Sequence, residues 1–142
     1  MQILTVYDKV ITTALTADVG EVIIPSNKEN SPFEKPLKGI TAVRTFVYGS
    51  GGTTAKLFLQ TSLDGGVTWI DIATTGDMAA TSGIKIVNLT DQTTITTSIA
   101  PTDGTGTTNI SGIIGDRFRC KVTTTGTYGG STTLKVIIIP RY

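Results

Sequence analysis

Residues 117–125 read R-F-R-C-K-V-T-T-T, and this stretch decides the class of fold. Apolar side chains alternate there with charged or hydroxyl-bearing ones, which is the period of two that a half-buried β-strand requires. We expect the apolar set, Phe118, Cys120 and Val122, to point into a core and the residues between them to point outward. A helix would need its apolar residues three and four positions apart, so the stretch predicts a strand.

The same alternation recurs along the chain, and no window has a helical period; residues 77–80 could form a single turn at most. The further expected strands are residues 40–48, 54–62, 67–73, 83–89, 93–99 and 132–139. Glycine-rich stretches at residues 49–52 and 126–130 separate neighbouring strands, and we expect each to close a hairpin. Short strands at this spacing predict an all-β fold, an antiparallel β-sandwich of jelly-roll or immunoglobulin-like type with about seven to nine strands.

Length and composition fit one domain over residues 1–142. Hydrophobic residues make up 39% of the chain, which is enough to form a core. An N-terminal arm is a candidate extension of this domain. Two further segments are too long and too polar for plain turns: a proline-rich loop at residues 25–39 and a Thr/Gly-rich stretch at residues 90–109.

Two places are candidates for contact with another protein. The proline-rich loop carries Phe33 among charged residues, so it predicts either an arm with an apolar anchor or a solvated surface loop. The last expected strand is apolar on both faces at residues 136–139, as in a central strand covered on both sides or a strand with an intersubunit contact. Phe33, Ile137 and Ile139 are therefore the candidate interface residues, and Pro140 is expected to end the strand by removing a backbone donor.

Charged residues are scarce at 16% of the chain, whereas Thr makes up roughly a fifth of it. A Thr-covered surface can pack against a partner at a low desolvation cost, which suits assembly. The net charge of +1, with scattered Lys and Arg, gives no field that would attract nucleic acid. We recognise no signal peptide and no apolar stretch of membrane-spanning length, so we expect a soluble chain made in a cytoplasm, without contact to a membrane.

The residue types needed for common catalytic sites are missing. The chain has no His, which excludes a Ser-His-Asp triad, a Cys-His pair and an imidazole metal site. The carboxylates are dispersed near expected turns, and Cys120, the one cysteine, is expected to be a buried apolar side chain. We therefore assign no catalytic, metal or cofactor-binding residue and expect neither an enzyme nor a cofactor; a paired-carboxylate hydrolase is the remaining enzymatic alternative.

Residues 62–69, S-L-D-G-G-V-T-W, resemble the Asp-box found at hairpin turns of sialidase-type propellers and other carbohydrate-active proteins. In such a turn the Asp64 carboxylate can accept backbone N–H groups, Gly66 can adopt a positive φ and the Trp69 ring can cover the turn. Sialidases carry several boxes, an arginine cluster and a catalytic Tyr, whereas this chain has one box. The resemblance thus implies a structural hairpin without enzymatic residues, formed by Ser62, Asp64, Gly66, Thr68 and Trp69.

A wider resemblance covers about the second two-thirds of the chain. LFLQTSLDGGVTWIDIATTG at residues 57–76 and GDRFRCKVTTTGTYGGSTTLKVIII at residues 115–139 resemble small structural proteins of tailed bacteriophages. The resemblance implies a β-sandwich that decorates the capsid or sits at the neck or tail of a virion. It implies no particular functional residue.

The sequence thus predicts a virion structural protein, most concretely a capsid decoration or cement protein that stabilises the head by packing. Its expected partners are the major capsid protein or other virion proteins and copies of itself, with a trimer favoured because it suits a three-fold lattice position. A neck, tail or baseplate component is the alternative within this class. A carbohydrate-binding module is the alternative from another class, and it would need Tyr48 and Tyr128 exposed on one edge.

Overall fold

The computed structural model describes residues 1–14, 18–23 and 36–142. Within these ranges the protein has ten strands and no helix. The strand order is β1-β10-β3-β7 in a first sheet and β2-β8-β5-β6 in a second, while β4 and β9 form a short ribbon; every pairing is antiparallel. The strands are β1 (Leu4–Val10), β2 (Asp18–Ile23), β3 (Gly39–Val47), β4 (Ser50–Gly51), β5 (Thr54–Ser62), β6 (Ile70–Asp77), β7 (Gly83–Thr90), β8 (Arg117–Thr125), β9 (Tyr128–Gly129) and β10 (Thr133–Arg141).

The expected all-β, antiparallel class is confirmed, and the number of strands differs slightly from expectation. Two of the additional strands, β4 and β9, have two residues each, which is too short for an alternation to reveal them. Leu4–Val10, where we considered an N-terminal arm, forms β1 and pairs with β10. Asp18–Ile23 forms β2 and pairs with β8, although Gly20 at its centre weakens any strand signal.

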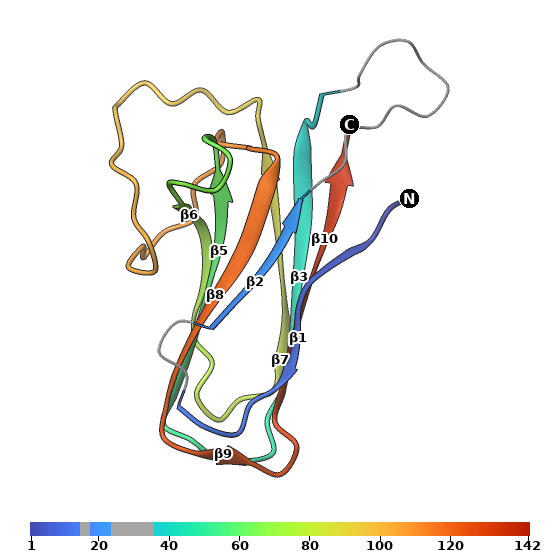
Figure 1. Ribbon diagram of the computed structural model, residues 1–142, viewed down its shortest axis with the longest axis vertical. Helices are drawn as coiled ribbons and strands as arrows, with labels where there is room; N and C mark the ends of the chain where they lie inside the picture. The colour runs from blue at the N-terminus through green and yellow to red at the C-terminus, as the bar shows by residue number, and fades with distance from the viewer. Residues whose placement is uncertain (15–17, 24–35) are drawn as a thin grey trace.

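One buried cluster draws its side chains from both sheets, which lie side by side as two layers (Figure 1). On β8 the expected alternation is observed, since Phe118, Cys120 and Val122 are fully buried. Phe46 on β3 and Leu134 on β10 meet this cluster from the first sheet. Burial of one such side chain stabilises a fold by about 1.5–3 kcal/mol, so the shared core holds the two sheets together.

The eight longer strands pair in a nested order. β5 pairs with β6, β3 with β7, β2 with β8, and β1 with β10, as in one long antiparallel ribbon folded at the β5–β6 connection. Successive pairs of this ribbon belong alternately to the second and the first sheet. Among these eight strands, β5 and β6 are consequently the one pair that is consecutive in the chain and lies in the same sheet.

The two glycine-rich stretches do not close hairpins, so that prediction is wrong. Residues 49–52 lead from β3 in the first sheet to β5 in the second, and residues 126–130 lead from β8 back to β10. The two connections pair with each other as β4 and β9, at the end of the molecule where Figure 1 labels β9. Gly52 has a φ of 72°, and a Cβ there would overlap the Tyr128 ring, so only glycine lets the connections approach this closely.

Residues 93–99 do not form the expected strand, and this prediction is also wrong. Their threonines favour extended backbone, but a strand needs a partner, and none of these residues pairs in a ladder. Residues 91–116 instead form one irregular segment, here called the strap, which runs as a wide yellow-to-orange loop beside β5 and β6 in Figure 1. The Gly112 N–H closes its base by donating to the Thr90 carbonyl over 2.8 Å.

Two predicted strand ends also move. β6 begins at Ile70 instead of residue 67, because Val67 and Thr68 donate their N–H groups to the Asp64 carboxylate and are part of the turn. β10 continues through Pro140 to Arg141, so the expected stop at Pro140 is wrong. The β1 ladder has ended at Ile138, and Pro140 lies where only β3 flanks the strand, a position at which a missing donor is tolerated.

Candidate interaction surfaces

The turn at residues 62–69 joins β5 to β6 and is organised by Asp64. Asp64 Oδ1 accepts hydrogen bonds from the N–H groups of Val67 (3.1 Å) and Thr68 (2.7 Å) and from the Ser62 hydroxyl (2.9 Å). Hydrogen bonds from the Thr68 backbone and side chain, among others, lower the pKa of Asp64 to about 2. Gly66 has a φ of 94° and donates to Ser62 Oγ over 2.8 Å. The Asp64 carboxylate thus holds the turn through three hydrogen bonds to Oδ1.

Trp69 follows the turn and is buried, with 7% of its surface exposed. The Arg119 guanidinium lies over its ring, 4.3 Å from the centroid. Such a cation–π contact gains strength where water is excluded. Trp69 therefore connects the turn to the outward side of β8.

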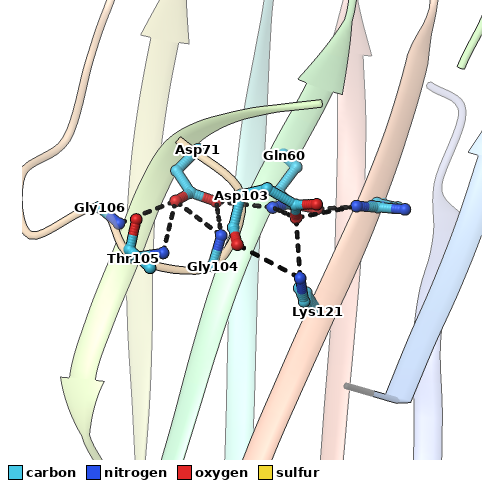
Figure 2. A network of polar contacts seen from close by, with 8 residues as sticks. Gln60, Asp71, Asp103, Gly104, Thr105, Gly106 and Lys121 are labelled. Carbon is cyan, nitrogen blue, oxygen red and sulfur yellow. Dashed lines mark hydrogen bonds and ion pairs between the residues drawn. The ribbon is translucent and has the colours of Figure 1, made fainter. Parts of the chain in front are cut away.

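The outward side of the second sheet, here called the covered face, carries a buried polar network beneath the strap (Figure 2). Asp71 is 1% exposed and accepts hydrogen bonds from three consecutive backbone N–H groups of the strap, at Gly104 (2.9 Å), Thr105 (3.1 Å) and Gly106 (2.8 Å). The Gln60 amide donates to the same carboxylate over 2.7 Å. Burial raises the pKa of Asp71, but these hydrogen bonds outweigh burial and hold that pKa below its ordinary value.

Asp103 is the strap's own contribution to the network. Its Oδ1 atom accepts from Gln60 Nε2 over 2.8 Å, from Arg119 over 3.0 Å and from Lys121 over 2.9 Å (Figure 2). Burial raises the pKa of Asp103, but the Gln60 and Lys121 contacts lower it by more. The network thus links Asp71 on β6 to two cations on β8 and fixes the strap on the sheet.

Sequence reasoning missed this network, since it treated the carboxylates as turn formers. A usable signal was present. Gln60 and Arg119 stand at outward positions of expected strands, and outward polar residues on adjacent strands often meet. The positions of Asp103 and of the strap glycines could not be predicted in the same way, because the strap has no repeating pattern of polar and apolar residues.

The outward side of the first sheet, here called the open face, is different in chemistry. One register row crosses the whole sheet as Thr5, Ile137, Val43 and Ile86, without any charged residue. Ile86 is 68% exposed, so no described segment covers the end of this row. The remaining outward apolar positions on these four strands are Val10, Val47, Ile84 and Ile139.

Neighbouring rows of the open face are dominated by hydroxyl and aliphatic side chains. Thr41 pairs with Ile139, and Thr45 pairs with both Lys135 and Ile84. Lys135 is opposite Asp8 on β1, a residue of opposite charge. The exposed apolar side chains of this face are Val10, Val47, Ile84 and Ile86. Exposed apolar patches are typical of surfaces that meet a partner.

The predicted interface residues fall in two groups. Ile137 and Ile139 lie half-buried on the open face, on a strand that is central in its sheet, between β1 and β3. Phe33 and most of the proline-rich loop at residues 25–39 lie outside the described residues.

The two tyrosines that a carbohydrate-binding module would need do not form an exposed platform. Tyr128 is 2% exposed, and its hydroxyl donates to the Ala79 carbonyl over 2.9 Å. Tyr48 packs edge-on against Tyr128, with ring centroids 6.3 Å apart. Both rings stabilise the crossing of the glycine-rich connections, so stacking of a sugar on this pair has no support.

Two absences hold for the described part of the chain. It has no group of three or more His, Cys, Asp or Glu side chains placed to hold a metal ion. It also has no helix long and apolar enough to cross a membrane. Cys120 is fully buried, and burial raises the pKa of its thiol far above the ordinary value.

Comparisons with known proteins identify no relative. No family model matches the chain, and no match was found among curated proteins or among solved structures.

Proposed function

We propose that this protein is a virion structural protein, specifically a capsid decoration protein of a tailed bacteriophage, and that it packs through the open face against the major capsid protein and copies of itself. The uncharged row of Thr5, Ile137, Val43 and Ile86 is the observation that carries this proposal. The resemblance of residues 57–76 and 115–139 to phage structural proteins supports the same assignment.

The physical chemistry of the open face favours association. Aliphatic surface contributes roughly 25 cal/mol per Å² when it leaves water, and threonine hydroxyls cost little to desolvate compared with charges. Ile84 and Ile86 expose 63% and 68% of their surface, so a partner would remove much apolar area from water. No buried charge would have to be neutralised along the central row.

We further infer that the two sheets form a β-sandwich of the jelly-roll type. With the eight longer strands counted in chain order, the pairs are first with eighth, second with seventh, third with sixth and fourth with fifth. A ribbon rolled in this way gives two packed four-stranded sheets, which is the jelly-roll arrangement found in viral capsid and lectin domains. The arrangement supports a role in a particle.

The proposal is tested by placing a charge on the open face. Ile86→Lys should convert a self-associating protein to a monomer, because a lysine there would lose its hydration in the contact. Val67→Lys is the matched control, since Val67 is 83% exposed on the turn after β5, away from the open face. Sedimentation velocity of the wild type and both variants measures the result.

We expect the wild type and Val67→Lys to form the same oligomer, a trimer if the protein occupies a three-fold position. A monomeric wild type, or an Ile86→Lys variant that associates as the wild type does, would contradict the use of the open face. Imaging of particles that contain the labelled protein is a separate test. It would show whether the protein lies on the shell or at the neck, tail or baseplate. Absence from every particle would rule out the virion role.

A further inference from the structure

A cavity of about 270 Å³ lies between the two sheets, beside the edge strands β6 and β7. Its walls are largely aliphatic, with Leu57, Leu59 and Val136 among them. Three polar side chains that line it determine which kind of ligand it could bind: Arg44, Thr75 and Lys85. Ile86 of the open face and Asn109 of the strap also line it, so it opens beside both outward faces.

Arg44 points inward from β3 and is 5% exposed, which is unusual for an arginine. Its Nη1 atom has one long hydrogen bond, to the Gly83 carbonyl at 3.5 Å, and its Nε atom has no partner. The other buried side-chain oxygen or nitrogen without a partner in the described residues is Thr75 Oγ1. Both unpartnered atoms thus belong to residues that line the same cavity.

The cavity also has an uncompensated positive charge. Lys85 is opposite Arg44 in the β3–β7 ladder and lies at the exposed edge of the sheet. No Asp or Glu lines the cavity, and neither cation forms an ion pair with a described residue. Burial lowers the pKa of Arg44, but a guanidinium stays protonated at neutral pH. A buried charge of this kind calls for an anionic partner.

We propose that this cavity binds a small organic carboxylate with an apolar body. The carboxylate accepts hydrogen bonds from Arg44 Nε and the Thr75 hydroxyl, and the apolar body lies against Leu57, Leu59 and Val136. Lys85 attracts the anion at the exposed edge. A carboxylate matches the planar guanidinium and needs few other donors, whereas a strongly hydrated phosphate would lose more solvation than these side chains replace.

The test uses the unmodified protein first. Hexanoate is titrated while the side-chain Nε–H resonance of Arg44, assigned with an Arg44→Lys variant, is followed by NMR. We expect a saturable shift of this resonance with hexanoate, binding at least about tenfold weaker with the uncharged hexanamide, and no saturable shift with inorganic phosphate. Equal binding of hexanoate and hexanamide, saturable binding of phosphate, or no shift with hexanoate would overturn the proposal.

Variants then assign the binding to the cavity. Arg44→Met keeps a long side chain without the charge and should abolish hexanoate binding, and Lys85→Met should weaken it. Arg141→Met is the matched control, because Arg141 is an exposed arginine on β10 whose guanidinium bonds to Thr41 outside the cavity. Circular dichroism establishes that each variant is folded; should Arg44→Met not fold, the titration of the wild type decides. A folded Arg44→Met variant that binds hexanoate like the wild type would overturn the proposal.

Discussion

The covered face and the open face occupy equivalent outward positions on the two sheets, yet the strap covers the first and no described segment covers the second. On the covered face, Gln60 and Asp71 are buried because the strap brings backbone N–H groups to them. On the open face, Ile86 has no such cover within the described residues. Polar side chains can thus be covered by the same chain when each group finds a partner, whereas the aliphatic side chains of the open face stay exposed in the described part of the chain.

This comparison predicts different sensitivities to substitution. The covered face depends on specific donors and acceptors in one geometry, so loss of one group leaves several others unsatisfied. In the proposed association the open face contributes apolar area and no buried polar network, and its exposed side chains contribute little to the stability of the isolated chain.

The largest effect is expected for Asp71→Ala. It leaves three strap N–H groups without their acceptor and removes one of the two acceptors of the Gln60 amide, so we expect a loss of about 3 kcal/mol in the free energy of unfolding. Urea unfolding measures the loss, and hydrogen exchange should show faster exchange at Gly104 to Gly106. Asp116→Asn is the control, because Asp116 is exposed. A loss no greater than that of the control would show that the strap does not depend on Asp71.

A smaller effect is expected from acid. Asp71 and Asp103 have pKa values below those of an unfolded chain, so the folded state binds fewer protons and their contribution is fully present above about pH 4. This contribution to the free energy of unfolding should be lost as the pH falls from about 4 through the lower pKa values that the two carboxyl groups have in the folded state. The free energy of unfolding, measured between pH 6 and pH 2.5, should decline more steeply for the wild type than for Asp71→Ala. Parallel profiles would argue against a role of Asp71 in this acid sensitivity.

The smallest effect is expected on the open face. Ile86→Val removes one methylene group from an exposed side chain and should change the free energy of unfolding of the monomer by less than about 0.3 kcal/mol. The same substitution at the fully buried Ile138 should cost about 1 kcal/mol. Urea unfolding of both variants at low protein concentration compares them. Equal costs would mean that Ile86 is buried in the isolated chain.

The strands could be predicted largely from local pattern, but their partners could not. Residues 117–125 alternate so regularly that β8 and its buried side were predictable from nine residues. Whether a glycine-rich stretch closes a hairpin or crosses between sheets depends on packing far away in the chain. The composition of residues 49–52 and 126–130 suits a hairpin turn and a crossing between sheets equally well. Their mutual pairing as β4 and β9 identifies them as crossings.

The candidate surfaces were predictable to a similar extent. Ile137 and Ile139 were recognisable because their strand is apolar on both sides, while Val43 and Ile86 join them only through the register of β3 and β7. The strap was misread as containing a strand, since threonine-rich stretches suit extended backbone whether or not a partner strand exists. Arg44 is the one charged residue of residues 40–48, and its burial could not be predicted from the alternation there.

The nested pairing of the strands has a consequence for how this chain reaches its fold. Among the eight longer strands that the structure describes, the β5–β6 hairpin is the one pair that can form between neighbours in the sequence, and each further pair must wait for a larger loop to close. Folds dominated by such distant contacts form on the slow side, in milliseconds to seconds. The turn held by Asp64 therefore joins the one pair that can assemble early, and the strands of the open face come together only when the ends of the ribbon meet.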